Sequence, residues 1–114
     1  MQPDQNQPST VSKRLALLRD IIKNNITKQE LLRCLSDGLW HSTSELARFA
    51  RKTNPVMGLV TVGTILNRMQ NQLGEQFLEN MVQHPEPGVA SWRIGVEWLD
   101  VVTEVLKETE GSTS

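Results

Sequence analysis

Residues 61–73, TVGTILNRMQNQL, form the stretch that decides how the rest of this 114-residue chain is interpreted. At 100° per residue its large apolar side chains share one stripe, as in an amphipathic helix with one buried face. That stripe consists of Val62, Ile65, Leu66, Met69 and Leu73. We therefore predict a helix over 61–73, with Gly74 in the C-terminal capping position.

The opposite side of this predicted helix has short hydrogen-bonding side chains and a single charge. These residues are Thr64, Asn67, Arg68 and Asn71. Such a face presents donors and acceptors, so base edges in the major groove of DNA are one candidate ligand. A solvated face with no ligand is an equally good interpretation. Gly63 costs about 1 kcal/mol relative to Ala within a helix, and either a close backbone approach or sequence drift accounts for it.

Upstream, residues 27–38 begin and end like a second helix. Thr27 and Glu30 have the spacing of a capping box, and Ile26 with Leu31 has the spacing of a hydrophobic staple. Gly38 is suited to close this helix. The buried face is predicted to consist of Leu31, Leu32 and Leu35.

The capping-box spacing recurs at Ser42 and Glu45, after the short apolar piece 39–41. We expect a short strand at 39–41 and a helix over 43–51, followed by a loop or turn over 53–60, which contains Pro55 and Gly58. The predicted buried residues of the helix are Leu46, Ala47, Phe49 and Ala50, and the predicted outward cations are Arg48, Arg51 and Lys52.

Downstream, residues 77–82 fit either a half-buried strand or a helical turn and a half. The segment 89–94, VASWRI, alternates apolar and polar residues with a period of two, and the turn sequence HPEPG precedes it at 84–88. A strand needs a partner, so we predict a hairpin of 77–82 with 89–94. Trp40 and Trp92 are then expected in the core of a small sheet.

Two more helices are predicted to flank this central part. Residues 10–25 have a broad apolar stripe, and residues 96–109 place apolar side chains on one side and charges on the other. The first of these helices could pack on the last, or could meet a partner helix in a dimer. We expect a single domain over 10–109, a disordered leader at 1–9 and a frayed tail at 110–114.

Composition and charge limit the classes of function. The net charge is −1, but residues 1–57 hold nine Lys and Arg against five acids, whereas residues 58–114 hold three against eight. This asymmetry suits a basic face with an acidic end. The single cysteine, Cys34, is expected to be a buried thiol, and two distant histidines predict no metal site. With no membrane span, signal peptide, phosphate loop or nucleophile–base pair, we expect a cytoplasmic non-enzyme without cofactors.

The order of predicted elements over residues 27–95 resembles the winged helix-turn-helix superfamily. The matching segments are ELLRCLSDGLWHSTSELA, TVGTILNRMQNQLG and FLENMVQHPEPGVASWRI. The resemblance implies a mainly α fold with a small β-hairpin wing (α+β), flanked by extra N- and C-terminal helices. In small bacterial regulators of this kind such additions commonly form the dimer interface, so 10–25 and 96–109 are candidates for a homodimer contact.

The resemblance also implies which residues would contact double-stranded DNA. The outer face of the third helix would read the major groove, and cations before it would hold phosphates. The wing residues that face away from the core would add contacts. The implied DNA-binding residues are Thr61, Thr64, Asn67, Arg68, Asn71, Arg48, Arg51, Lys52, Ser91 and Arg93.

Three functions are compatible with these features of the sequence. The first is a dimeric, sequence-specific DNA-binding protein that regulates transcription. The second is a winged-helix module that binds a protein, which the acidic second half and the tip residue Glu86 favour. The third is an enzyme or small-molecule binder, for which no motif argues. Clustered cations at 48–52 and Arg68 would favour the first, and an exposed apolar patch at Met57, Leu59 and Val60 would favour the second.

Overall fold

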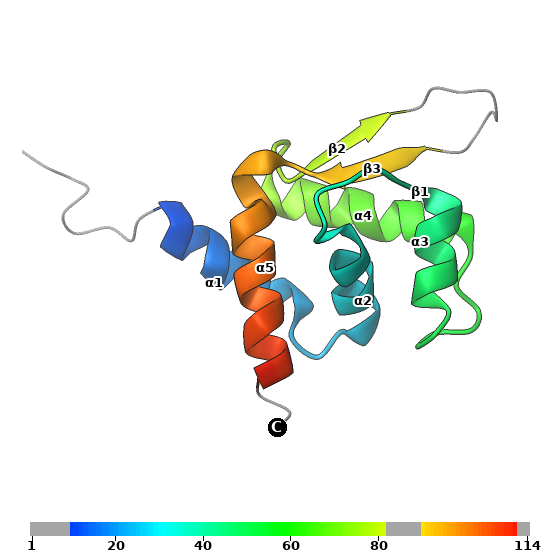
Figure 1. The fold of residues 1–114 in the computed structure, drawn as a ribbon, viewed down its shortest axis with the longest axis horizontal. Coiled ribbons are helices and arrows are strands. Elements are labelled where there is room, and N and C mark those ends of the chain that lie inside the picture. Colours follow the sequence, from blue (N-terminus) through cyan, green and yellow to red (C-terminus); the bar gives the residue numbers. More distant parts are fainter. Residues whose placement is uncertain (1–9, 82–89, 112–114) are drawn as a thin grey trace, which may run out of the picture.

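The computed structural model describes residues 10–81 and 90–111, which form helices around a small sheet (Figure 1). The predicted leader at 1–9, the predicted turn at 84–88 and the end of the predicted tail lie outside the described residues. The elements in chain order are α1 (Thr10–Ile22), α2 (Ile26–Leu35), β1 (His41–Ser42), α3 (Thr43–Ala50), α4 (Leu59–Leu73), β2 (Leu78–Met81), β3 (Ser91–Ile94) and α5 (Val96–Gly111).

The three strands form one antiparallel sheet in the order β1-β3-β2. β2 pairs with β3 from Leu78 opposite Ile94 to Met81 opposite Ser91, which decides the ambiguous segment 77–82 in favour of a strand. Along β3, Trp92 and Ile94 are buried, whereas Ser91 and Arg93, which alternate with them, are only half-buried, as the alternation predicted. The sequence therefore predicted the pairing of the hairpin strands correctly.

Helix α4 lies at the centre of the helical part and buries the predicted stripe against the core. Val62, Leu66 and Met69 are fully buried, whereas Ile65 is half-buried. The helix begins at Leu59, two residues earlier than predicted, because extended Gly58 forms its N-cap. The predicted loop over 53–60 is therefore too long at its C-terminal end.

The start of α2 differs from the prediction. The side-chain oxygen of Asn25, not that of Thr27, accepts the backbone N–H of Lys28 at 3.0 Å, and Asn24 turns the chain with φ of 63°. An Asn side chain is short enough to cap a helix directly, so the helix starts one residue before Thr27. Ile26 is consequently inside the helix and 59% exposed, and the predicted hydrophobic staple does not form.

The start of α3 confirms half of the predicted capping box. The hydroxyl of Ser42 accepts the backbone N–H of Glu45 at 3.1 Å. The carboxylate of Glu45 does not return to Ser42, because it lies 3.0 Å from Nδ1 of His41. Phe49, expected in the core, is half-buried.

Helices α1 and α5 pack side by side (Figure 1). The first flanking helix therefore packs on the last helix of the same chain, which is one of the two predicted arrangements. Trp98 of α5 is buried, and its ring meets that of Phe77 edge to face at 5.2 Å. At Gly95, immediately before α5, a Cβ atom would lie 1.9 Å from the carbonyl oxygen of Gln76, so only glycine fits there. The predicted apolar side of 96–109 is confirmed, and the helix continues to Gly111.

Candidate nucleic-acid interface

The outer face of α4 presents its polar side chains to solvent. Each of the α4 residues that were predicted to contact DNA bases is exposed. None of them makes a side-chain hydrogen bond or ion pair with another residue that the structure describes. These residues are Thr61, Thr64, Asn67, Arg68 and Asn71. Buried or paired polar groups maintain a fold, whereas groups left exposed and unpaired are available to a ligand.

Val60 belongs to the same face, although the sequence interpretation assigned it to the preceding loop. It lies four, seven and eleven residues before Thr64, Asn67 and Asn71, so all four share one stripe of α4. Its side chain is 83% exposed. If the predicted helix had been extended two residues before Thr61, Val60 would have been placed on this face.

The N-terminus of α4 has no side-chain cap, because Gly58 is the N-cap residue. The preceding turn is held in place from α3: Nε of Arg51 donates a hydrogen bond of 2.8 Å to the carbonyl oxygen of Met57. Met57 itself is buried. A helix N-terminus without a capping side chain offers its first backbone N–H groups to an anion.

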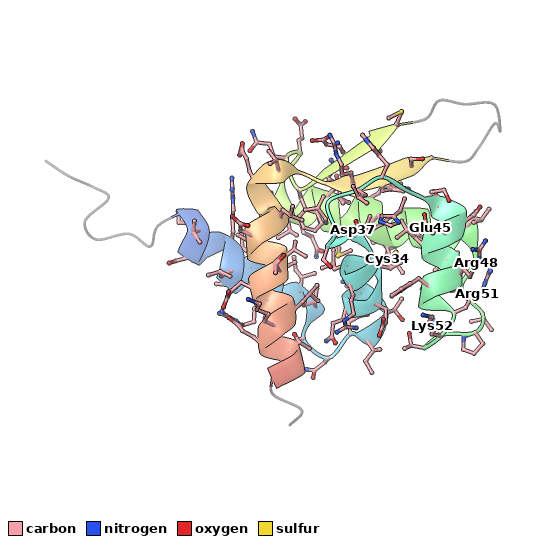
Figure 2. The ribbon with its side chains drawn as sticks, in the orientation of Figure 1. Cys34, Asp37, Glu45, Arg48, Arg51 and Lys52 are labelled. Carbon is pink, nitrogen blue, oxygen red and sulfur yellow. The ribbon has the colours of Figure 1, made fainter. Side chains whose placement is uncertain are left out.

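The cations at the end of α3 gather on one part of the molecule (Figure 2). Arg48 is exposed and makes no hydrogen bond or ion pair with another described side chain, whereas Nε of Arg51 holds the turn before α4. The ammonium of Lys52 lies 4.4 Å from the centre of the Phe49 ring. The C-terminal end of α3 therefore places three positive charges next to the turn that leads into α4.

Arg93 is held on the outer surface of the sheet. Its guanidinium forms an ion pair with Glu79 and lies 4.6 Å from the centre of the Trp40 ring. Trp40, expected in the core, is therefore half-buried on the outside, where it packs beneath Arg93. The pairing with Glu79 reduces the charge that Arg93 can offer to a phosphate. Ser91, the other predicted wing residue, is half-buried on β3.

A titratable cluster joins α2 to α3 and was missed in the sequence (Figure 2). Nε2 of His41 lies 2.9 Å from the carboxylate of Asp37, and Nδ1 lies 3.0 Å from that of Glu45. Burial acts to lower the pKa of His41, but hydrogen bonds and charges from both carboxylates raise it above its ordinary value. The nearby thiol of Cys34 is half-buried, and burial raises its pKa to about 11. The cluster is a structural clamp in which both carboxylates favour the protonated form of His41.

The described residues contain no group of three or more His, Cys, Asp and Glu side chains arranged to hold a metal ion. Within the same residues, no helix has the length and apolar character needed to cross a membrane. Comparisons with models of known protein families, with curated protein sequences and with solved structures find no match to this chain.

Proposed function

We propose that this chain is a winged-helix protein that binds double-stranded DNA sequence-specifically and regulates transcription. The observation that carries the proposal is the outer face of α4, where hydrogen-bonding side chains are exposed and unpaired among the described residues. Arg can bind guanine through two hydrogen bonds and Asn can bind adenine in the same way, so Arg68, Asn67 and Asn71 suit the major groove.

The arrangement of elements supports the winged-helix assignment. Helix α2, strand β1 and helices α3 and α4 are followed by the antiparallel pair β2 and β3, and β3 lies between β1 and β2 in the sheet. α3 packs on α4 and on α2, as expected for a helix-turn-helix unit. In such a unit the second helix enters the major groove while the first crosses the backbone. Here these helices are α4 and α3.

Phosphate contacts are assigned to the side of α4 that faces the end of α3. The cations there are Arg48, Arg51 and Lys52, and the uncapped N-terminus of α4 adds backbone N–H donors. One recognition helix with a single basic residue gives a small counterion-release contribution. Tight binding therefore needs two subunits, each placing one α4 in successive major grooves about one helical turn apart.

We assign the homodimer contact to α1, to α5, or to both. In α1, Leu18 and Ile22 are buried in the core of the domain, but Val11 is 56% and Leu17 49% exposed. These two side chains are available to a second copy of the helix. Sedimentation equilibrium tests the dimer: a monomer at tens of micromolar protein would remove it, and a dimer that Leu17→Ser dissociates would support it.

Selection of a preferred site from random duplex DNA tests the reading role of α4. Arg68→Ala should then cost about 1–3 kcal/mol at one base position and little at the others. Equal weakening on every sequence would demote Arg68 to a phosphate contact. Lys107→Ala, at an exposed position on α5, is the matched control and should leave the sequence preference unchanged.

A protein-binding winged-helix module is the second candidate function. The observation that favours it is an exposed apolar group at the turn before α4 and in the first turn of α4: Val56 is 87%, Leu59 42% and Val60 83% exposed. Met57, expected in this patch, is buried and does not contribute. A partner captured by the wild type and by Arg68→Glu, but lost in Leu59→Ser, would support this function over DNA binding.

A further inference from the structure

Val60 is an apolar residue on the otherwise polar outer stripe of α4. The stripe continues through Thr64, Asn67 and Asn71, all of which are exposed. Val60 is 83% exposed, so its side chain gains little from packing within the described domain. Valine is also a poorer helix former than alanine. Burial and helix propensity do not favour a valine at this position, which shares its high exposure with Val56 and Val96.

The position of Val60 within α4 suggests what it contacts. It is the second residue of the helix, in the turn that lies beside Arg51 and the other cations of α3. In helix-turn-helix proteins the N-terminal residues of the recognition helix contact base edges. Among those edges, thymine alone presents a methyl group, at C5, next to the acceptor O4.

We propose that Val60 packs against the C5-methyl group of a thymine and so determines a base preference of the protein. This inference rests on the proposed DNA-binding function and names one feature of its ligand. Thr64 lies one helical turn further on, with its Cβ about 5–6 Å away, close enough to donate a hydrogen bond to the same or the next base. Val60 and Thr64 together match the methyl and acceptor pattern of a thymine edge.

The surroundings of Val60 favour a base edge over an apolar protein surface. Its neighbours along the stripe are polar, Leu59 is only 42% exposed and Met57 is buried, whereas Val56, which is 87% exposed, lies in the turn before α4 and not on this stripe. A protein partner that docked by apolar contact would need a wider continuous patch. The positive charges at the end of α3 and the uncapped amides of α4 lie together at the N-terminal end of α4, where they complement a phosphate.

The test replaces thymines by deoxyuridine, one at a time, in the duplex that the wild-type protein selects. Deoxyuridine lacks only the C5-methyl group, so hydrogen bonding is unchanged. At one thymine in each half-site the wild type should lose about three- to fivefold in affinity, the value of one buried methyl group. That thymine should lie within about two base pairs of the position that Thr64→Ala affects.

Val60→Ala is the informative variant, because alanine favours the helix and the protein should remain folded. It should bind the thymine and deoxyuridine duplexes equally. Val96→Ala is the matched control: Val96 is also in the first turn of a helix and is 81% exposed, but it belongs to α5. This control should keep the full thymine preference of the wild type.

The outcomes separate the two proposals. Binding to DNA without a thymine-sensitive position, or with a sensitivity that persists in Val60→Ala, would overturn the role of Val60 and leave the DNA-binding function standing. No binding to any duplex would overturn the proposed function and this inference with it.

Discussion

The charged side chains on the α1–α5 surface and those on the α3–α4 surface are used differently. On α1, Arg19 forms a two-bonded ion pair with Glu108 of α5, with N–O distances of 2.8 and 2.9 Å. Arg14 donates to the backbone and carboxylate of Glu97. On α4, Arg68 and the polar residues beside it make no such contact with other described residues. The first surface holds the fold together, and the second is left available.

This difference shows where the basic residues of the first half and the acidic residues of the second half lie on the molecule. Several acids of the second half lie on α5, where two of them neutralise cations of α1. The hydrogen bond from Arg19 and its charge lower the pKa of Glu108, so that this pair stays ionised. The cations at the end of α3 have no such partners among the described acids. A near-neutral chain thereby keeps a local positive surface beside α4.

Removal of the Phe77 ring, which packs against Trp98 beneath the α1–α5 surface, should have the largest effect on stability. Phe77 is fully buried and supports Trp98, whose ring in turn carries the guanidinium of Arg14 at 5.1 Å. Phe77→Ala should lower the free energy of unfolding by about 3–5 kcal/mol in urea denaturation. Leu59→Ala, at the start of α4, should cost far less because Leu59 is partly exposed. A loss below about 1 kcal/mol for Phe77→Ala would contradict this packing.

A pair of arginine variants compares the two surfaces directly. Arg14→Ala removes a contact with the Trp98 ring and bonds to Glu97, and should cost about 1–2 kcal/mol of stability. Arg48→Ala should change stability by less than about 0.5 kcal/mol, because Arg48 is exposed and unpaired among the described residues. DNA affinity should change in the opposite order. Equal stability losses in the two variants would remove the distinction between the surfaces.

The His41 clamp should make stability depend on pH. Because the folded-state pKa of His41 is raised, its contribution is fully present below the ordinary pKa and is lost as pH rises through the folded value. His41→Gln should therefore cost about 1 kcal/mol near pH 5.5 and less near pH 8.5. Urea denaturation of both proteins at the two pH values measures this. The same loss at both values would show that the charge of His41 contributes nothing.

Gly63 offers the smallest effect and one of opposite sign. A Cβ atom at this position would meet nothing within 4 Å, so no close approach within the described chain requires glycine. Gly63→Ala should stabilise the protein by about 0.5–1 kcal/mol, as measured by thermal or urea denaturation. A destabilised variant would mean that α4 has a neighbour at this point. Weaker DNA binding in a stabilised variant would place a DNA backbone close to Gly63.

The parts of the fold that follow from local rules were predictable from the sequence. The apolar stripe of α4, the cap at Ser42 and the alternation along β3 each depend on residue spacing within one element. The start of α2 was wrong because Asn25 and Thr27 are both competent caps, and only the turn at Asn24 decides between them. The start of α4 was wrong because Gly58 has no capping side chain to mark it.

Contacts between elements could not be read from residue spacing. Trp40 was expected in the core, but it lies on the outside of the sheet beneath the guanidinium of Arg93, which is itself paired with Glu79 of the neighbouring strand. The pairing of His41 with Asp37 and Glu45 also depends on how α2 meets α3. The candidate site was more accessible to prediction, because the outer residues of one helix follow from its buried stripe. Val60 was missed only through the helix boundary.

Fluorescence anisotropy of random duplex DNA at about 50 mM and about 200 mM salt tests the central claim most directly. The wild type and Arg68→Glu are compared, with Lys107→Glu as a control for the added negative charge. We expect weak binding by the wild type and by the control that falls with salt, and no binding by Arg68→Glu. No binding by the wild type at low salt, or binding that Arg68→Glu leaves unchanged, would contradict the assignment of α4 to DNA.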